Sequence, residues 1–183
     1  MTTVVLLAAG RSSRFGPQCK LQAIYRGKPL VRHAAEAILG TGLYAIAVTA
    51  DPAVARLLPE FRLVFSDGVQ SDSLRAGLRQ VADEAAMIVL GDMPHVTTGL
   101  LQRIAASGVP AAATDGNRIC PPVLLPRSLF PEVRTLTGDQ GAGALLRSLP
   151  HLQHIAVPSE ILRDLDVPGD LLSAQDLPAP PNI

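Results

Sequence analysis

The sequence predicts an α/β fold in which helices cover both faces of a mostly parallel central sheet. Three observations support this fold: short apolar runs without polar alternation, helical patterns between them, and the regular alternation of the two. Strands that are apolar throughout are typical of parallel sheets buried on both faces. Strand–helix alternation is typical of such layered folds. The 183 residues, of which 48% are hydrophobic, suffice for one ordinary domain.

Apolar runs predict six strands, at residues 3–8, 44–49, 62–65, 86–90, 109–114 and 122–125. Helical patterns lie between some of them, at residues 29–40, 73–85 and 97–107. Pro29 stands near the start of the first helix and Gly40 follows its end, which is the usual placement of these two residues. Leu74 and Leu78 share one face of the second helix, and Thr97 is the expected N-cap of the third.

The pattern loosens after about residue 108, where proline and glycine become denser. We expect one domain over residues 1–177, with two halves at 1–108 and 109–177. Residues 178–183 form a proline-rich end that we expect to be a poorly ordered tail.

Composition excludes several classes of function. The formal net charge is zero, which argues against a nucleic-acid or acidic-membrane partner. Aromatic residues make up 3% and tryptophan is missing, so no stacking platform for single strands is expected. The sequence has no apolar run long enough to span a membrane, and its beginning resembles a strand rather than a signal peptide. With only Cys19 and Cys120, no disulfide framework is indicated, and we expect a cytoplasmic protein.

A cationic loop follows the first predicted strand, in LLAAGRSSRFG at residues 6–16. Arg11, Arg14 and Lys20 gather where the carboxyl end of a parallel strand would place a ligand. Small residues let the backbone approach that ligand, and clustered cations suit a polyphosphate. The alternative is a solvated loop whose charges point outward. Phe15 and Ser12 break the P-loop and dinucleotide-binding patterns, so neither motif applies.

An acidic residue follows another buried strand, in MIVLGDMPHV at residues 87–96. Asp92 is placed to hold Mg²⁺, which takes one or two carboxylates together with waters and substrate phosphates. The alternative is an aspartate that stabilises a turn. A cationic loop after the first strand favours the metal and polyphosphate interpretation.

These segments together resemble the MobA-like nucleotidyltransferases, and most of all the molybdenum cofactor cytidylyltransferases. LLAAGRSSRFG with Lys20, and VLGDMP, resemble the two most specific motifs of that family. GKPLVRHAAEAI, SDSLRAGL, PPVLLPRSLFPEVRTLTGDQGAGALL and LRDLDVPGDL resemble further family segments in the same order. The resemblance covers most of the chain. It implies a three-layer Rossmann-like nucleotidyltransferase fold with a mostly parallel central sheet.

The resemblance also implies a reaction and a set of site residues. A phosphate-bearing acceptor attacks the α-phosphorus of a nucleoside triphosphate, pyrophosphate leaves, and Mg²⁺ bridges the phosphates. The implied catalytic residues are Arg14, Lys20 and Asp92. The implied nucleotide-binding residues, in the first half, are Leu7, Ala8, Ala9, Gly10, Arg11, Lys20 and Ser73. The implied acceptor-binding residues, in the second half, are Asp139, Gly141 and Asp166, and the implied metal ligands are Asp92 and Asp166.

The base and the acceptor stay open at this point. Ala9 in LAAG resembles the cytidylyl branch, whereas the guanylyl branch has LAGG, so CTP is the expected substrate and GTP or ATP the alternative. A methyl group discriminates by only about 1–3 kcal/mol. Molybdopterin is the acceptor that the resemblance implies, with a molybdoenzyme or its chaperone as protein partner. Sugar phosphate, methylerythritol phosphate or phospholactate are alternative acceptors, and a non-catalytic nucleotide-binding maturation factor is an alternative function.

Two departures from the family concern the acceptor half. Gly143 stands where the family has arginine, and DLDVPGDL keeps Asp164 and Asp166 while losing a threonine and a glutamate. The nucleotide half therefore resembles the family more closely than the acceptor half does.

Structural alternatives exist for several of these residues. Ser73, Asp139 and Asp166 each precede a helical pattern and are alternatively helix caps. His95 is interpreted as a loop residue. His151 and His154 are expected at the surface.

Overall fold

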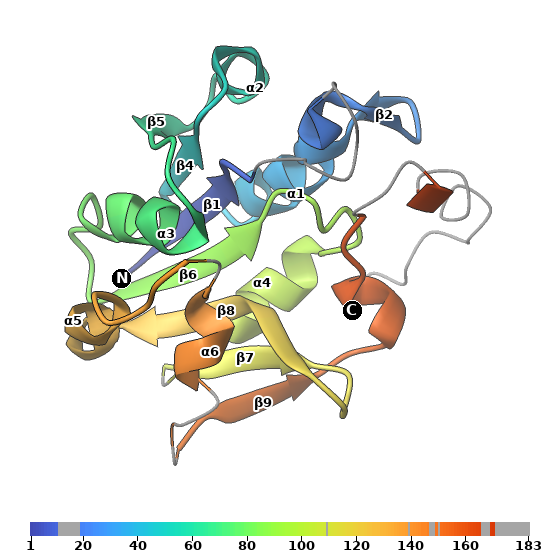
Figure 1. The fold of residues 1–183 in the computed structure, drawn as a ribbon. Helices are drawn as coiled ribbons and strands as arrows, with labels where there is room; N and C mark the ends of the chain where they lie inside the picture. Colours follow the sequence, from blue (N-terminus) through green and yellow to red (C-terminus); the bar gives the residue numbers. More distant parts are fainter. Residues whose placement is uncertain are drawn as a thin grey trace.

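The computed structural model describes residues 1–10, 19–108, 110–138, 140–146, 149, 151–165 and 169–170. Its centre is a seven-stranded sheet in the order β5-β4-β1-β6-β8-β7-β9 (Figure 1). The strands are β1 (Thr2–Ala8), β4 (Ala45–Thr49), β5 (Arg62–Phe65), β6 (Ala85–Leu90), β7 (Ala111–Thr114), β8 (Ile119–Pro126) and β9 (Gln153–Ala156). Each of the six predicted strands is present.

The sheet is mostly parallel, as predicted. β1 lies between β4 and β6 and is parallel to both, and β5 extends the sheet in parallel beyond β4. β8 is antiparallel to β6 and to β7, while β9 returns parallel to β7. The part of the chain after residue 108, where strand–helix alternation becomes less regular, therefore corresponds to the part of the sheet where strand direction reverses.

Helices form a layer on each face of the sheet (Figure 1). Residues of α1 (Leu30–Leu39) and α4 (Thr98–Ala105) pack in one apolar core with Val4 and Leu6 of β1. Residues of α3 (Gln70–Leu78), α5 (Phe130–Val133) and α6 (Ala142–Leu146) pack in the other with Val5 and Leu7. Successive residues of β1 thus face opposite layers, which explains why the strand is apolar throughout. Within the described residues, no helix is long and apolar enough to cross a membrane.

Two predicted helices are confirmed. The third is present, but both of its predicted ends are wrong. Helix α1 ends just before Gly40, and the Thr97 hydroxyl caps α4 by accepting from the Leu100 N–H at 3.2 Å. Helix α3 begins three residues before Ser73, after Val69, because the Asp72 carboxylate accepts the Val69 N–H at 3.2 Å and closes the first turn. Its end at Leu78 leaves residues 79–84 to form the connection to β6.

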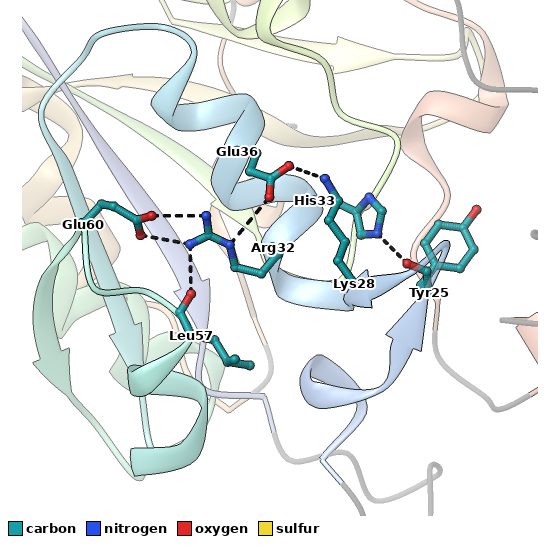
Figure 2. Close-up of polar contacts among 7 residues, drawn as sticks. All are labelled: Tyr25, Lys28, Arg32, His33, Glu36, Leu57 and Glu60. Carbon is teal, nitrogen blue, oxygen red and sulfur yellow. Dashed lines mark hydrogen bonds and ion pairs between the residues drawn. The ribbon is translucent and has the colours of Figure 1, made fainter.

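A hairpin and a short helix in the first half of the chain were not predicted. Strands β2 (Ile24–Tyr25) and β3 (Lys28–Pro29) form a hairpin ahead of α1, and the five-residue α2 (Pro52–Arg56) follows β4. Polar side chains of α1 hold the surrounding segments, as Figure 2 shows. Arg32 binds the Glu60 carboxylate and the Leu57 carbonyl beyond α2, and Glu36 pairs with Lys28 of the hairpin. Exposed ion pairs of this kind contribute about 0–1 kcal/mol each, so they orient the segments more than they stabilise them.

We expect Gly77→Ala to destabilise the protein, although alanine is the better helix former by about 1 kcal/mol. Gly77 lets α3 lie close to the sheet: a Cβ there would be 2.5 Å from Val5 Cγ1 and 3.0 Å from Val48 Cγ2. Overpacking of this kind costs about 1–3 kcal/mol and outweighs the gain in propensity. Urea unfolding of Gly77→Ala, with and without Val5→Ala to make room, measures the effect. An equal cost in both backgrounds would contradict the close approach.

Candidate functional site

The carboxyl ends of three neighbouring strands meet at one edge of the sheet. Ala8 at the end of β1 pairs with Thr49 at the end of β4, and Leu7 pairs with Leu90 at the end of β6. Ala9, which follows β1, is buried, and Gly10 is exposed with open space where a Cβ would stand. An open α/β sheet binds ligands at this edge.

A lysine and an aspartate from opposite ends of the first half meet at this edge. Lys20 Nζ donates to Asp92 Oδ2 at 2.6 Å, and their side chains are only 11% and 19% exposed. Lys20 begins a single 3₁₀ turn at Lys20–Gln22, and Asp92 follows β6 by two residues. A short, charge-assisted bond with little solvent exposure is stronger than a surface ion pair.

The backbone holds Asp92 against the end of β1. The Gly91 N–H donates to the Leu7 carbonyl at 3.0 Å, which continues the β1–β6 pairing beyond the last ladder residue. A Cβ at Gly91 would lie 3.3 Å from that carbonyl oxygen, so glycine permits the close approach. The Leu165 N–H donates to the Asp92 carbonyl at 3.1 Å and brings a late segment of the chain to the same place.

Asp92 offers one carboxylate ligand to a divalent cation. Hard cations such as Mg²⁺ bind through one or two carboxylates and complete their shell with water and phosphate oxygens. The Asp92 carboxylate is partly accessible, and its Oδ2 already binds a cationic group. The Lys20 ammonium and a metal ion would therefore compete for Asp92, whereas an anionic ligand would attract both.

A buried aromatic pair supports the Asp92 segment from the side of the hairpin. The Tyr25 hydroxyl and His95 Nε2 are 3.3 Å apart, and both side chains are buried. His33 of α1 contacts the Tyr25 carbonyl through Nε2 at 2.8 Å, which Figure 2 shows. The Tyr25 ring also packs with Leu30 and Leu165. Tyr25 thus joins α1, the hairpin, the Asp92 segment and the late segment.

His95 is held in its neutral form at physiological pH. Burial, and then the nearby positive charges of Arg26, His33 and Arg163, lower the pKa of His95 to about 4. His95 lies in a loop, as interpreted from the sequence, but it is 4% exposed and belongs to the packed interior. His151 and His154 are exposed, as expected.

We expect acid to destabilise the protein partly through His95. Because its pKa is about 4 in the folded chain and about 6.5 in an unfolded chain, the unfolded chain binds more protons between these values. The contribution of His95 to the free energy of unfolding is therefore fully present above about pH 6.5. It is lost as the pH falls toward 4, by on the order of 3 kcal/mol. Urea unfolding from pH 7.5 to 4.5 should show a shallower loss in His95→Gln. The exposed His154→Gln should retain the wild-type slope, and equal slopes for all three proteins would contradict the assignment.

The start of α3 lies against the segment that precedes α6. The Ser71 N–H donates to the Gly138 carbonyl at 3.1 Å, and Arg75 Nη1 donates to the Leu136 carbonyl at 2.7 Å. A Cβ at Gly141 would be 3.0 Å from Gln70 Nε2, so Gly141 also borders this helix. Ser71 Oγ is buried and, among the described residues, has no hydrogen-bond partner.

The structure thus locates some of the predicted site residues and corrects one alternative. Leu7 and Ala8 are in β1, and Ala9, Gly10, Lys20 and Asp92 lie at its carboxyl end. Ser73 is buried within α3, so its interpretation as a helix cap is wrong; the side chain of Asp72 closes that turn. Arg11, Arg14, Asp139 and Asp166 lie outside the described residues. In the described part of the chain, no three or more histidine, cysteine, aspartate or glutamate side chains lie where they could hold a metal ion together.

Sequence reasoning missed four residues around this edge: Gln22, Tyr25, Asp51 and Leu165. Asp51 alone carried a readable signal, because an aspartate before proline after a strand is typical of a helix N-cap. Its Oδ1 indeed accepts the Ala53 N–H of α2 at 2.7 Å. The other three act through tertiary contacts that no local pattern specifies.

A mostly parallel sheet with helices on both faces and a lysine–aspartate pair at the carboxyl ends of its strands is the layout of an α/β domain that binds a ligand at this edge. The chain belongs to the family of the MobA-like NTP transferase domain, whose family model matches residues 4–155. The family predicted from the sequence motifs is therefore confirmed.

The chain is similar over most of its length to one named protein and to several solved structures. It is 30% identical over 170 residues to the nicotine blue oxidoreductase of Paenarthrobacter nicotinovorans, covering 82% of this chain and 83% of that protein. The crystal structure of Rv0371c from Mycobacterium tuberculosis superposes with a TM-score of 0.83 at 27% identity, covering 96% of this chain and 98% of the other. A nucleotidyl transferase from Methanothermobacter thermautotroptrophicus shares the fold with a TM-score of 0.83 at 24% identity, covering 96% of each chain. Rv0371c has also been solved in complex with manganese, and that structure superposes with a TM-score of 0.73 at 26% identity over 86% of this chain and 88% of the other.

Proposed function

We propose that this protein is a Mg²⁺-dependent nucleotidyltransferase that moves a nucleoside monophosphate, CMP from CTP, to a phosphate-bearing acceptor and releases pyrophosphate. The contact between Lys20 and Asp92 carries the proposal, since it places a cation and a carboxylate together at the ligand-binding edge. Family membership supports the reaction class. The manganese complex of the mycobacterial relative supports a divalent cation.

The residues of the chain have separate roles in this proposal. Ala8, Ala9 and Gly10 leave room for the nucleotide beside the backbone at the carboxyl end of β1. The Lys20 ammonium, with Arg11 and Arg14 outside the described residues, neutralises the triphosphate and the leaving pyrophosphate. Asp92, joined by Asp166, would hold Mg²⁺. When bound, this cation would neutralise negative charge on the phosphate oxygens. Catalysis of this kind depends on positioning and electrostatics more than on covalent chemistry.

We assign the acceptor to the second half of one domain over residues 1–177. Asp139, Gly141 and Asp166 are its proposed contacts, and Ser73 stays a proposed contact of the nucleotide. The buried Ser71 hydroxyl supports a ligand beside the first turn of α3, because a bound group would supply the partner that the described part of the chain does not. A molybdopterin cofactor is the proposed acceptor and the cytoplasm the proposed compartment, while sugar phosphate, methylerythritol phosphate and phospholactate remain alternatives.

Oxidoreduction is the second candidate function, favoured by the 30% identity to a protein named as an oxidoreductase. Nicotinamide nucleotides are common hydride donors and also present a pyrophosphate to a protein. They would use the same cationic edge, so direct binding distinguishes the two candidates.

Calorimetric titration with CTP, GTP, ATP, UTP and NADH, each with and without Mg²⁺, tests the proposal. We expect CTP to bind most tightly and only weakly without the metal. A preference for another triphosphate would correct the base and keep the reaction class. Binding of NADH with no binding of any triphosphate would overturn the proposal in favour of oxidoreduction. Binding without pyrophosphate release in the presence of molybdopterin or the alternative phosphate acceptors would favour a non-catalytic maturation factor.

A further inference from the structure

We propose that Gln22 and Asp51 form a positioning pair that sets where the Lys20 ammonium lies. The inference rests on the proposed function, in which Lys20 binds the triphosphate. Neither residue is one of the three cations of the loop after β1, and Asp51 follows β4 rather than β6. Gln22 Nε2 donates to Asp51 Oδ2 at 2.7 Å, so the pair has the length of a charge-assisted hydrogen bond.

The turn that carries Lys20 is short and tightly bonded. The Gln22 N–H donates to the Cys19 carbonyl at 3.0 Å, and the Ala23 N–H donates to the Lys20 carbonyl at 3.1 Å. Leu21, between Lys20 and Gln22, is 3% exposed and packs in the core on the α1 side of the sheet. Because the turn is closed by its own backbone, any displacement of Gln22 is passed to Lys20.

Asp51 is a fixed anchor for that turn. Its Oδ1 accepts the Ala53 N–H at 2.7 Å and caps α2, while its Oδ2 accepts from Gln22. The Asp51 N–H in turn donates to the hydroxyl of Thr49, a fully buried residue at the end of β4, at 3.2 Å. Both carboxylate oxygens and the backbone of Asp51 are thus occupied, which leaves the side chain little freedom.

The turn is therefore held from both sides of β1. Gln22 ties it to the end of β4 through Asp51, and Lys20 ties it to the end of β6 through Asp92. Since β1 lies between β4 and β6, the turn spans the end of the strand from which the cationic loop departs. When a ligand draws Lys20 away from Asp92, the Gln22–Asp51 bond and the packing of Leu21 would keep the turn in place.

A reciprocal exchange of charge tests the pair. In Gln22→Glu, two carboxylates would face each other and the contact would be lost. In the double variant Gln22→Glu with Asp51→Asn, the amide at position 51 can donate to the new carboxylate while its oxygen still caps α2. Net charge in the double variant equals that of the wild type, and charge effects on a bound polyphosphate add between the two positions. Non-additivity therefore isolates the contact itself.

We expect CTP–Mg²⁺ affinity to fall about tenfold in Gln22→Glu and to return to within about twofold of wild type in the double variant, since small misplacements of a binding group have large effects. Asp51→Asn alone should have a small effect, because the Gln22 amide can turn its oxygen toward the new donor. CMP affinity should change little in all variants. A purely structural role would lower the affinities for CTP and CMP alike. That result, or additive effects of the two substitutions, would overturn the proposal.

Amine labelling tests the same pair without any nucleotide. The chain has two lysines, so mass spectrometry after limited acetylation reports Lys20 against Lys28 as the internal reference. We expect Lys20 to be protected in the wild type, labelled several-fold faster in Gln22→Glu and protected again in the double variant. If the wild type bound no triphosphate, the proposed function would fail while the labelling still decided the positioning. Unchanged labelling of Lys20 in Gln22→Glu would overturn the positioning pair whatever the nucleotide data show.

Discussion

Asp92→Asn should lower the rate of Mg²⁺-dependent pyrophosphate release at least about a hundredfold. The substitution keeps the size of the side chain but removes the negative charge that would hold the metal. Loss of one such electrostatic contact costs about 3 kcal/mol or more in the transition state. It also removes the counter-charge that Asp92 gives the Lys20 ammonium, whose side chain is 11% exposed and paired at 2.6 Å. Turnover with saturating CTP measures the loss of rate. Mn²⁺ binding, measured by electron paramagnetic resonance, shows whether the metal is still held.

Asp83 is a matched control, because it lies at the opposite end of β1 and β6 from Asp92. Asp83 Oδ2 accepts from the Thr3 hydroxyl at 2.9 Å near the start of β1, far from the carboxyl ends. Asp83→Asn removes a carboxylate that is likewise bonded to a side-chain donor, and we expect turnover and Mn²⁺ binding to stay within about twofold of wild type. If Asp92→Asn behaved like this control, Asp92 would have no part in the mechanism.

The placement of both charged residues at one edge followed from sequence alone. The run VVLLAAG and the run AMIVL are each apolar on both faces, and in a parallel sheet their carboxyl ends lie at the same edge. The order of the strands in the sheet did not follow from the sequence. β1 lies directly between β4 and β6, and this order depends on tertiary packing. The Lys20–Asp92 contact joins residues 72 positions apart, and no local pattern encodes it.

Other features depended on side-chain contacts that compete with local preference. Ser73 resembled a helix cap because serine commonly caps, yet Asp72 closes the turn from inside the helix and α3 begins earlier. His95 resembled an ordinary loop residue, yet its contact with Tyr25 buries it. Loops with buried polar partners cannot be recognised from composition, because their burial is decided by segments distant in the chain.

Lys20→Met should have effects of opposite sign on two ligands. Methionine keeps an apolar stem of similar length but cannot donate to phosphate oxygens, so CTP affinity should fall roughly tenfold to a hundredfold. CMP, which lacks the β- and γ-phosphates, should lose about threefold or less. Because Lys20 Nζ also occupies Asp92 Oδ2 at 2.6 Å, its removal frees that oxygen and relieves a cationic neighbour. Affinity for Mn²⁺ alone should therefore rise several-fold, which a merely damaged site would not show.

Calorimetry with CTP and CMP, and paramagnetic titration with Mn²⁺, separate these effects. Lys28→Met is the matched control, because Lys28 is the other lysine of the chain and pairs with Glu36 on the surface of α1. It should leave all three affinities unchanged. Equal losses for CTP and CMP in Lys20→Met would argue against a contact with the triphosphate. A fall in Mn²⁺ affinity would mean that Lys20 supports the metal ligand rather than competing with the metal. The opposite signs are expected because one ammonium serves two anionic partners in turn: Asp92 without nucleotide, and the triphosphate once metal takes Asp92.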